Sequence, residues 1–214
     1  MPSNAYQYFC SSSLKNVTQL MELHSSNYSG PGKKSAGFLT SSGVLLLCSA
    51  WESYVEDVVK EASQRFTERE GGISLASMMP KRSQELLRRH VEKDLSKLIQ
   101  LADNWKPVFD NAVDERIRRA NGPRFKEVRS LIFDVIGDNG LSQSWTENEC
   151  DVVDELIDTR NKIAHGDRDQ KYVRKVKVED FIETIQSVAR KTDDWICEEL
   201  RDLKIGAWHK VRAA

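Results

Sequence analysis

The sequence has few cysteines and no cysteine cluster. Its four cysteines, Cys10, Cys48, Cys150 and Cys197, are scattered over 214 residues, and none belongs to a Cys-x-x-Cys pair. Cys48 and Cys197 lie among apolar neighbours. This usage excludes a disulfide-stapled scaffold and a cysteine-rich zinc site, and it favours a reduced, cytoplasmic protein.

The sequence also lacks long apolar runs. The longest one, residues 43–51, is far too short to span a bilayer. The N-terminus has no basic region followed by an apolar core, so we expect no signal peptide and no membrane association. No stretch alternates between apolar and polar residues as a half-buried strand would.

An excess of one charge is missing as well. Lysine and arginine number 32 against 33 acidic residues, and the net charge is −1. There is no global basic signal and no DNA-binding motif, so any contact with nucleic acid must come from a local patch. Phosphate-binding glycine loops and hydrolase or metalloprotease motifs are absent. His90 and His209 lack partners at metal-ligand spacing, and we expect both at the surface.

Helical periodicity dominates what is present. The sequence is 39% hydrophobic, which is enough for a core. We expect an all-α fold: a bundle of about five to seven helices in a single domain over residues 1–214, with a helical insertion at about 73–122. Around Leu45 and Leu46 the sequence is apolar on almost every face of the helix, which predicts a central position. The main helical segments are 4–25, 35–70, 81–103, 107–120, 123–136 and 178–203.

One helix, predicted within residues 146–167, has signals at both ends. Thr146 and Glu149 have the spacing of a capping box, and Gly166 stands where a left-handed C-terminal cap is expected. An apolar stripe between the caps contains Val153, Leu156, Ile157, Ile163 and Ala164. A polar stripe borders it and contains Asp151, Asp154, Asp158, Asn161 and His165.

Arg160 interrupts the apolar stripe and needs an explanation. A guanidinium group cannot lose its proton, so it must be paired, hydrated or directed at an anion. A buried ion pair between helices is one reading, and we propose Glu52 as the partner that pairs with or orients Arg160. The alternative for Glu52 is a solvent-facing position. The other reading for Arg160 is a site shared with Asn161 and His165, whose cation, amide and imidazole suit phosphodiester chemistry.

A family resemblance rests on these residues. Arg160-Asn161-x-x-x-His165 at the end of a capped helix resembles the Arg-x4-His signature of the HEPN superfamily, small α-helical domains of which many are metal-independent RNases. The earlier stretch Ser49-Ala-Trp-Glu52-Ser-Tyr-Val55 is similar to the RiboL-PSP-HEPN branch. The resemblance implies a HEPN-like bundle and a homodimer in which both motifs line one cleft.

The resemblance also implies roles for the motif residues. His165 would be the general acid or base at the ribose 2′-OH of single-stranded RNA. Arg160 would stabilise the charge that builds on the phosphate, and Asn161 would orient the phosphate or His165. No cofactor and no metal would be needed. Asp151, Asp154 and Asp158 climb a helix face instead of surrounding one point, which does not suit magnesium. The resemblance implies one of two biological settings. The protein would be a toxin of a toxin–antitoxin pair, with an antitoxin protein as partner, or an antiviral abortive-infection effector.

Two basic segments are candidates for RNA contacts. The charged loop after the motif supplies Arg168, Lys171, Arg174 and Lys175, and it directly follows His165. The arginines between Arg116 and Arg129 form the densest basic cluster, although a solvated face with local ion pairs explains them slightly better.

Two alternatives to an RNase remain open. One is a non-catalytic HEPN dimer that binds a nucleotide, an RNA or a partner protein, because a fold does not fix a function. The other is an interaction module in which Arg160 is purely structural.

Overall fold

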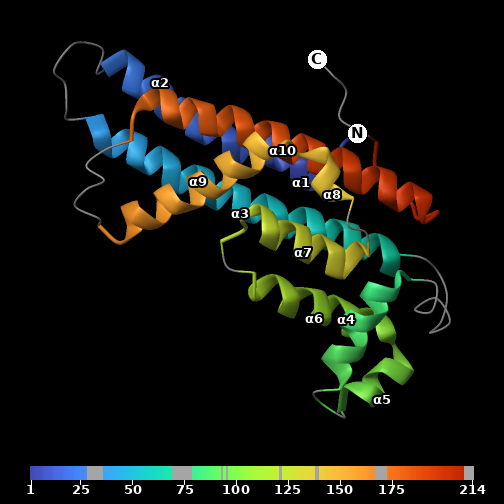
Figure 1. Ribbon diagram of the computed structural model, residues 1–214. Helices are drawn as coiled ribbons and strands as arrows, with labels where there is room; N and C mark the ends of the chain where they lie inside the picture. The colour runs from blue at the N-terminus through green and yellow to red at the C-terminus, as the bar shows by residue number, and fades with distance from the viewer. Residues whose placement is uncertain are drawn as a thin grey trace.

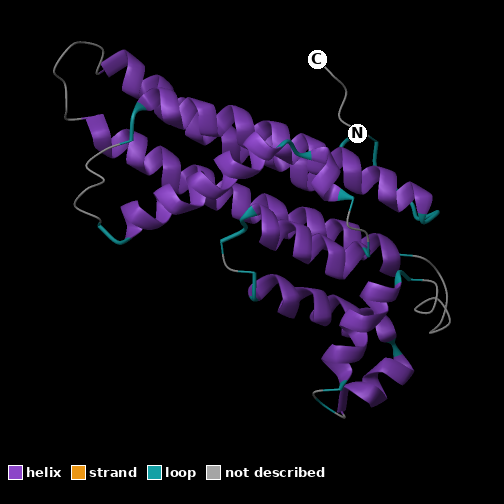
Figure 2. Cartoon of the chain, in the orientation of Figure 1, coloured by secondary structure: helices purple, strands orange, loops and turns teal. Residues whose placement is uncertain are grey.

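The computed structural model describes residues 1–27, 36–68, 79–92, 94, 96–120, 122–137, 140–166 and 173–209. All regular structure in these residues is helical, so the all-α prediction is confirmed (Figures 1 and 2). The elements are α1 (Asn4–Tyr8), a π-helical segment (Phe9–Leu14), α2 (Lys15–Asn27), α3 (Gly37–Thr67), α4 (Lys81–Val91), α5 (Ser96–Asp103), α6 (Trp105–Arg118), α7 (Phe125–Ile136), α8 (Leu141–Ser144), α9 (Glu147–Ala164) and α10 (Lys175–Asp202).

Helix α3 is the centre of the bundle. It packs against α1, α2, α6, α7, α9 and α10. Val44, Leu47, Trp51, Val55 and Val58 follow one another at helical spacing and are almost completely buried. The indole N–H of Trp51 donates to the carbonyl of Pro123 over 2.9 Å, which fixes the chain just before α7. The core therefore determines where α7 begins.

The N-terminal half of α3 is less covered than its sequence suggests. Leu45 is 38% exposed and Leu46 is 47% exposed, so these two side chains are at the surface although α3 is central, as predicted. The opposite face of the same turns, with Val44, Leu47 and Cys48, is buried. An apolar strip of α3 consequently remains at the surface of the chain.

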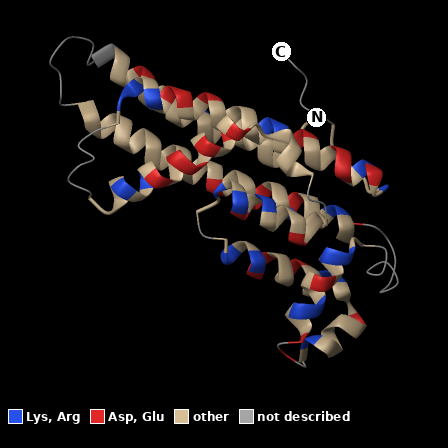
Figure 3. Cartoon of the chain, viewed as in Figure 1, with Lys and Arg blue, Asp and Glu red and all other residues tan. Residues whose placement is uncertain are grey.

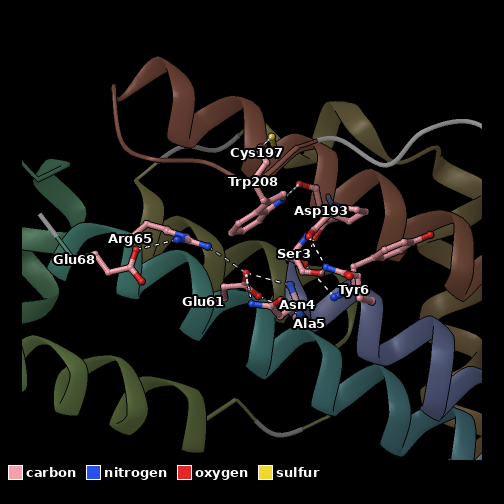
Figure 4. Close-up of polar contacts among 12 residues, drawn as sticks. Ser3, Asn4, Ala5, Tyr6, Glu61, Arg65, Glu68, Asp193, Cys197 and Trp208 are labelled. Atoms are coloured by element: carbon pink, nitrogen blue, oxygen red, sulfur yellow. Dashed lines mark hydrogen bonds and ion pairs between the residues drawn. The ribbon is translucent and has the colours of Figure 1, made fainter.

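The two ends of the described chain are fastened to the same part of the bundle (Figure 4). The Ser3 hydroxyl donates to the carboxyl group of Asp193 on α10, and the backbone N–H groups of Asn4 and Ala5 donate to Glu61 on α3 over 3.1 Å. The indole of Trp208 donates to the carbonyl of Asp193 over 3.2 Å. Burial raises the pKa of Asp193 to about 7, although Ser3 opposes the shift.

Helices α4, α5 and α6 form an arm at one end of the bundle (Figure 1). The helix predicted over residues 81–103 is two helices, since α4 ends at Val91 and α5 begins at Ser96. Helix α4 packs on α6 and α7, whereas α5 packs on α6 and buries none of its residues.

His90 of the arm corrects one expectation. It is 7% exposed, not a surface residue, and its Nδ1 lies 2.7 Å from a carboxylate oxygen of Glu115 on α6. The sequence could not show this partner because the two residues are 25 positions apart and on different helices.

No helix in the described ranges combines the length and the apolar character that crossing a membrane requires.

Candidate functional site

The N-terminal end of α9 is closed by hydrogen bonds. The capping box is present as predicted: the Glu149 N–H donates to the Thr146 hydroxyl over 3.2 Å, and the Thr146 N–H donates to the Glu149 carboxylate over 2.8 Å. Lys191 and Ser187 of α10 also donate to Glu149, each over 2.8 Å to the same oxygen. Burial opposes ionisation, but these donors hold the pKa of Glu149 down at about 2.

The middle of α9 is packed into the core. Val153, Leu156 and Ile157 of the predicted apolar stripe are buried, and so are Val152 and Thr159, which the stripe did not include. The Cys48 thiol of α3 lies 3.8 Å from the carbonyl of Leu156, which marks where the two helices meet. Helix α9 is therefore held rigidly up to about its third turn.

The C-terminal end of α9 is open to solvent. Gly166 has φ +65°, as the predicted left-handed cap requires. Ile163 is half-buried, but Ala164 and His165 are exposed, so the apolar stripe ends at Ile163, one residue before its predicted end. The His165 imidazole has no hydrogen-bond partner among the described residues. Within that part of the chain, the imidazole is therefore accessible to another molecule.

Arg160 and Asn161 line a small cleft beside α9. The cleft has a volume of about 150 Å³ and is completed by Glu52, Gly122, Arg124 and Ile157. A guanidinium Nη of Arg160 donates to the Asn161 side-chain oxygen over 3.1 Å, so these two motif residues contact each other directly.

Glu52 shares this cleft without pairing directly with Arg160. No ion pair within 4.0 Å joins the two among the residues that the structure describes. Both nevertheless act on the buried thiol of Cys48: burial and Glu52 raise its pKa to about 12, and Arg160 opposes them. Glu52 is thus placed to attract Arg160 across the cleft, while the guanidinium group keeps edges available for an anion.

Arg124 is a cleft residue that the sequence did not single out. Its guanidinium group pairs with Asp158 of α9, and the Phe125 N–H donates to Asp154 over 3.2 Å. The hydrogen bond to Asp158 raises the pKa of Arg124 and lowers that of Asp158. Asp154 and Asp158 are one helical turn apart, so a helical wheel could have predicted a cation opposite them, but not which one.

The predicted acidic stripe therefore attaches the start of α7 to α9. In the described part of the chain, no group of three or more His, Cys, Asp or Glu side chains is arranged to hold a metal ion.

The predicted RNA contacts after the motif are only partly described. Arg168 and Lys171 lie outside the described residues. Arg174 is exposed and precedes α10, whereas Lys175 forms an ion pair with Glu179 over 2.6 Å. Lys177 bridges α10 to Glu155 of α9, also over 2.6 Å. Of the two described candidates, Arg174 is the one that carries an unneutralised charge.

This arrangement can bind and polarise an anion. A cleft of this size admits a phosphate group or a few water molecules but not a whole nucleotide. Arg160 and Arg124 supply guanidinium edges, which suit phosphate oxygens. The exposed imidazole of His165 stands beyond the cleft on the same helix end.

Comparison with known proteins gives one match. A family model described as RiboL-PSP-HEPN matches residues 11–198, which is most of the chain. No curated protein and no solved structure matches the chain.

Proposed function

Since the chain belongs to the RiboL-PSP-HEPN family, we propose that it is an endoribonuclease that cleaves single-stranded RNA without a metal. The observation that carries the proposal is the open end of α9. Arg160 and Asn161 line a cleft in which no carboxylate forms an ion pair with Arg160 within the described chain, and His165 is exposed a turn away.

The proposed reaction is a transesterification within the RNA. His165 takes the proton of the ribose 2′-OH, and the 2′-oxygen attacks the adjacent phosphorus. The bond from phosphorus to the 5′-oxygen breaks, and that oxygen leaves with a proton from solvent or from a second imidazole. The products are a 2′,3′-cyclic phosphate and a 5′-hydroxyl. Arg160 stabilises the negative charge on the phosphate oxygens, where fixed charge has its largest effect. Asn161 orients the Arg160 guanidinium group.

The proposal includes a homodimer with a composite site. One motif offers a single exposed imidazole, so a second copy supplies the second imidazole that protonates the leaving oxygen. The exposed Leu45 and its neighbour Leu46 support this arrangement, because Leu45 lies two turns before Glu52 on the same face of α3, and Glu52 lines the motif cleft. A second copy placed there buries the apolar strip of α3 and brings two motif helices together.

A charged substitution in the apolar strip of α3 tests whether the protein forms the proposed dimer. Leu46→Glu places a carboxylate at an exposed position, so the subunit still folds, but pairing two copies buries that charge. We expect light scattering to show a monomer for Leu46→Glu and a dimer for wild type, and RNA cleavage to be lost with the dimer. Glu56→Gln, on the exposed side of the same helix, is the control. A monomeric wild-type protein with full activity would refute the composite site.

The biological setting that we propose is a toxin of a toxin–antitoxin pair or an antiviral abortive-infection effector. An antitoxin protein is then the expected partner. RNA cleavage by the free chain would arrest growth of the cell that makes it, and an inhibitory partner prevents this.

The chemistry is tested with purified protein and a labelled single-stranded RNA. We expect cleavage to persist in excess EDTA, and we expect mass spectrometry to find a cyclic phosphate at one end and a 5′-hydroxyl at the other. Loss of cleavage on chelation, with recovery on adding magnesium, would contradict the proposal. Products with a 5′-phosphate would contradict the role of the 2′-oxygen.

A second candidate function is a non-catalytic dimer that binds a nucleotide, an RNA or a protein. The lack of a hydrogen-bonded partner for the His165 imidazole among the described residues favours it, because catalytic histidines are commonly oriented by a neighbouring group. Retained RNA binding in a protein that never cuts would favour this candidate.

A further inference from the structure

The outer face of α7 carries a stripe of residues that the core does not use. Val128, Leu131, Ile132, Val135 and Ile136 face inward and are buried. The opposite side of the helix presents Lys126, Arg129, Ser130, Phe133 and Asp134, which follow one another at three- and four-residue spacing. We refer to these five residues as the α7 stripe.

Two neighbouring helices add arginines to the α7 stripe. Arg116 of α6 donates to Asp134 over 2.7 Å and to the Ser130 hydroxyl over 3.0 Å. Arg82 of α4 lies over the Phe133 ring, with its guanidinium carbon 4.7 Å from the ring centroid. These contacts place side chains from three helices on one surface. Figure 3 shows basic positions along the N-terminal part of α7 and on the neighbouring α4 and α6.

The charge of this surface is unbalanced. Four cations, Arg82, Arg116, Lys126 and Arg129, stand against two half-buried carboxylates of α7, Asp134 and Glu127. Lys126 and Arg129 are exposed and have no acidic partner among the described residues. A solvated helix face ordinarily mixes both signs, as α4 does with Arg88 and Arg89 against Glu85 and Glu92.

The position of Arg82 over the Phe133 ring favours the binding of an anion by its guanidinium group. A guanidinium group held over an aromatic ring can still donate its N–H groups to phosphate oxygens. The ring also limits the conformations of the side chain, so less entropy is lost on binding.

The α7 stripe begins at the motif cleft. Arg124, which lines the cleft with Arg160 and Asn161, is followed two residues later by Lys126 in the first turn of α7. Arg124 also ties that end of α7 to Asp158 of the motif helix. At its other end the stripe reaches a cavity of about 540 Å³ between α4, α6 and α7, whose lining includes Arg82, Arg116 and Asp134. The remaining acidic residues of that cavity are each paired with a basic residue of α4 or with Arg119, so they do not neutralise the exposed Lys126 and Arg129.

We propose that single-stranded RNA bound in the motif cleft continues along the α7 stripe, with its phosphates on Lys126, Arg129, Arg116 and Arg82. This inference rests on the proposed function and adds the path of the substrate. Helix α7 has 12 residues and is roughly 18 Å long. At a rise of about 3.4 Å per stacked nucleotide, the stripe accommodates roughly five nucleotides on one side of the cut.

The test measures RNA affinity in protein that cannot cut. Lys126→Gln with Arg129→Gln is made in the His165→Ala background, and binding of a fluorescent single-stranded RNA dodecamer is followed by anisotropy across a salt series. We expect binding to weaken roughly tenfold. The slope of log affinity against log salt should fall by about 1.4, because each phosphate contact contributes about 0.7 on a single strand.

The matched control removes the same charge elsewhere. Lys15→Gln with Lys204→Gln takes two exposed cations from α2 and from the segment after α10, which lie across the bundle from α6 (Figure 1). We expect this pair to leave the salt slope unchanged. Equal affinities and equal slopes for the two double variants would overturn the proposed path. All four positions are exposed, so melting curves should match that of the His165→Ala parent.

Cleavage of short and long RNA provides a second readout. A dinucleotide places its single phosphate in the motif cleft and has none left for the α7 stripe, whereas a dodecamer covers the stripe. In the active protein, Lys126→Gln with Arg129→Gln should lower kcat/KM for the dodecamer roughly tenfold and leave the dinucleotide unaffected, because phosphate contacts add affinity and not chemistry.

The outcomes separate this inference from the proposed function. Cleavage that is insensitive to the α7 variants at both lengths would refute the path and leave the RNase intact. Binding that depends on the α7 stripe in a protein that never cuts would support the path and refute the proposed catalysis. Failure of the His165→Ala protein to bind RNA at any salt concentration would overturn both.

Discussion

The two ends of α9 are built in opposite ways. At the N-terminal end, the carboxylate of Glu149 receives hydrogen bonds from Thr146, Ser187 and Lys191, so its charge is satisfied. At the C-terminal end, Arg160 and Asn161 face a cleft, and His165 is exposed. The N-terminal end of α9 thus connects two helices of the fold, whereas the C-terminal end presents polar groups at an open cleft.

The difference indicates that the two ends of α9 have different roles, one in stability and one in activity. Anchoring of the N-terminal end to α10, together with the buried middle, fixes the direction of the last turn. The C-terminal end can then present a cation, an amide and an imidazole in a fixed geometry without contributing to the core. We expect substitutions at the first end to change stability and substitutions at the second to change activity.

The largest expected effect is on catalysis at the C-terminal end. Arg160→Lys keeps the charge but loses the planar fork that holds two phosphate oxygens. We expect the cleavage rate to fall about 10²–10³-fold, the usual consequence of removing a group that stabilises developing charge. The unfolding midpoint should not change, because no ion pair to Arg160 is broken within the described residues.

Arg65→Lys is the matched control for Arg160→Lys, since Arg65 pairs with Glu61 and Glu68 at the far end of α3. It should cut RNA at the wild-type rate. Equal rates for Arg160→Lys and wild type would remove Arg160 from the active site.

The next effect is on stability at the N-terminal end. Glu149→Gln removes a charge whose folded-state pKa is about 2, and we expect a loss of ~2 kcal/mol at neutral pH with no change in cleavage well below the unfolding temperature. Because the folded pKa is lowered, the stabilisation is present above the unfolded pKa of 4.5 and disappears as pH falls from there towards 2.

Denaturant titrations at neutral and acidic pH measure this contribution. The difference between wild type and Glu149→Gln should shrink as the pH falls through that window. Glu147→Gln is the control, because Glu147 is exposed in the same helical turn and should contribute only ~0.5 kcal/mol through the helix dipole. A difference that persists undiminished at low pH would exclude the Glu149 charge as its source.

The smallest effect concerns the cap after His165. Gly166 has φ +65°, and an added methyl group would meet no atom within 4 Å, so Gly166→Ala costs backbone strain alone, ~1 kcal/mol. Gly206→Ala also meets no atom within 4 Å, and its backbone is not left-handed. It should therefore change the free energy of unfolding by less than half as much. Identical unfolding curves for the two variants would contradict the assignment of a left-handed cap.

Features of the fold that depend on neighbouring residues could be predicted from the sequence. The capping box at Thr146, the left-handed cap at Gly166 and the buried face of α3 each follow from residues close together in the chain. The all-α class followed from the same periodicity, and the family match agrees with the resemblance carried by Arg160, Asn161 and His165.

Pairings between distant residues were not predictable in this way. Arg124 meets Asp158 across 34 positions, and His90 meets Glu115 across 25. Each charge had several acceptable partners in the sequence, and only packing selects one. The exposure of Leu45 and Leu46 was not predictable for the converse reason. An apolar side chain predicts burial, but a single chain cannot show whether its cover comes from the same subunit or from another.

The most direct test of the account is the cleavage rate of His165→Ala, measured in EDTA beside wild type with the unfolding midpoint of both. His165 is exposed at the end of α9, so its removal opens no cavity and the midpoint should be unchanged. We expect wild type to cut single-stranded RNA and the variant to cut it about 10²–10⁴-fold more slowly, the usual contribution of general acid–base catalysis. Equal rates for the two proteins would contradict the assignment of the C-terminal end of α9 as the active site.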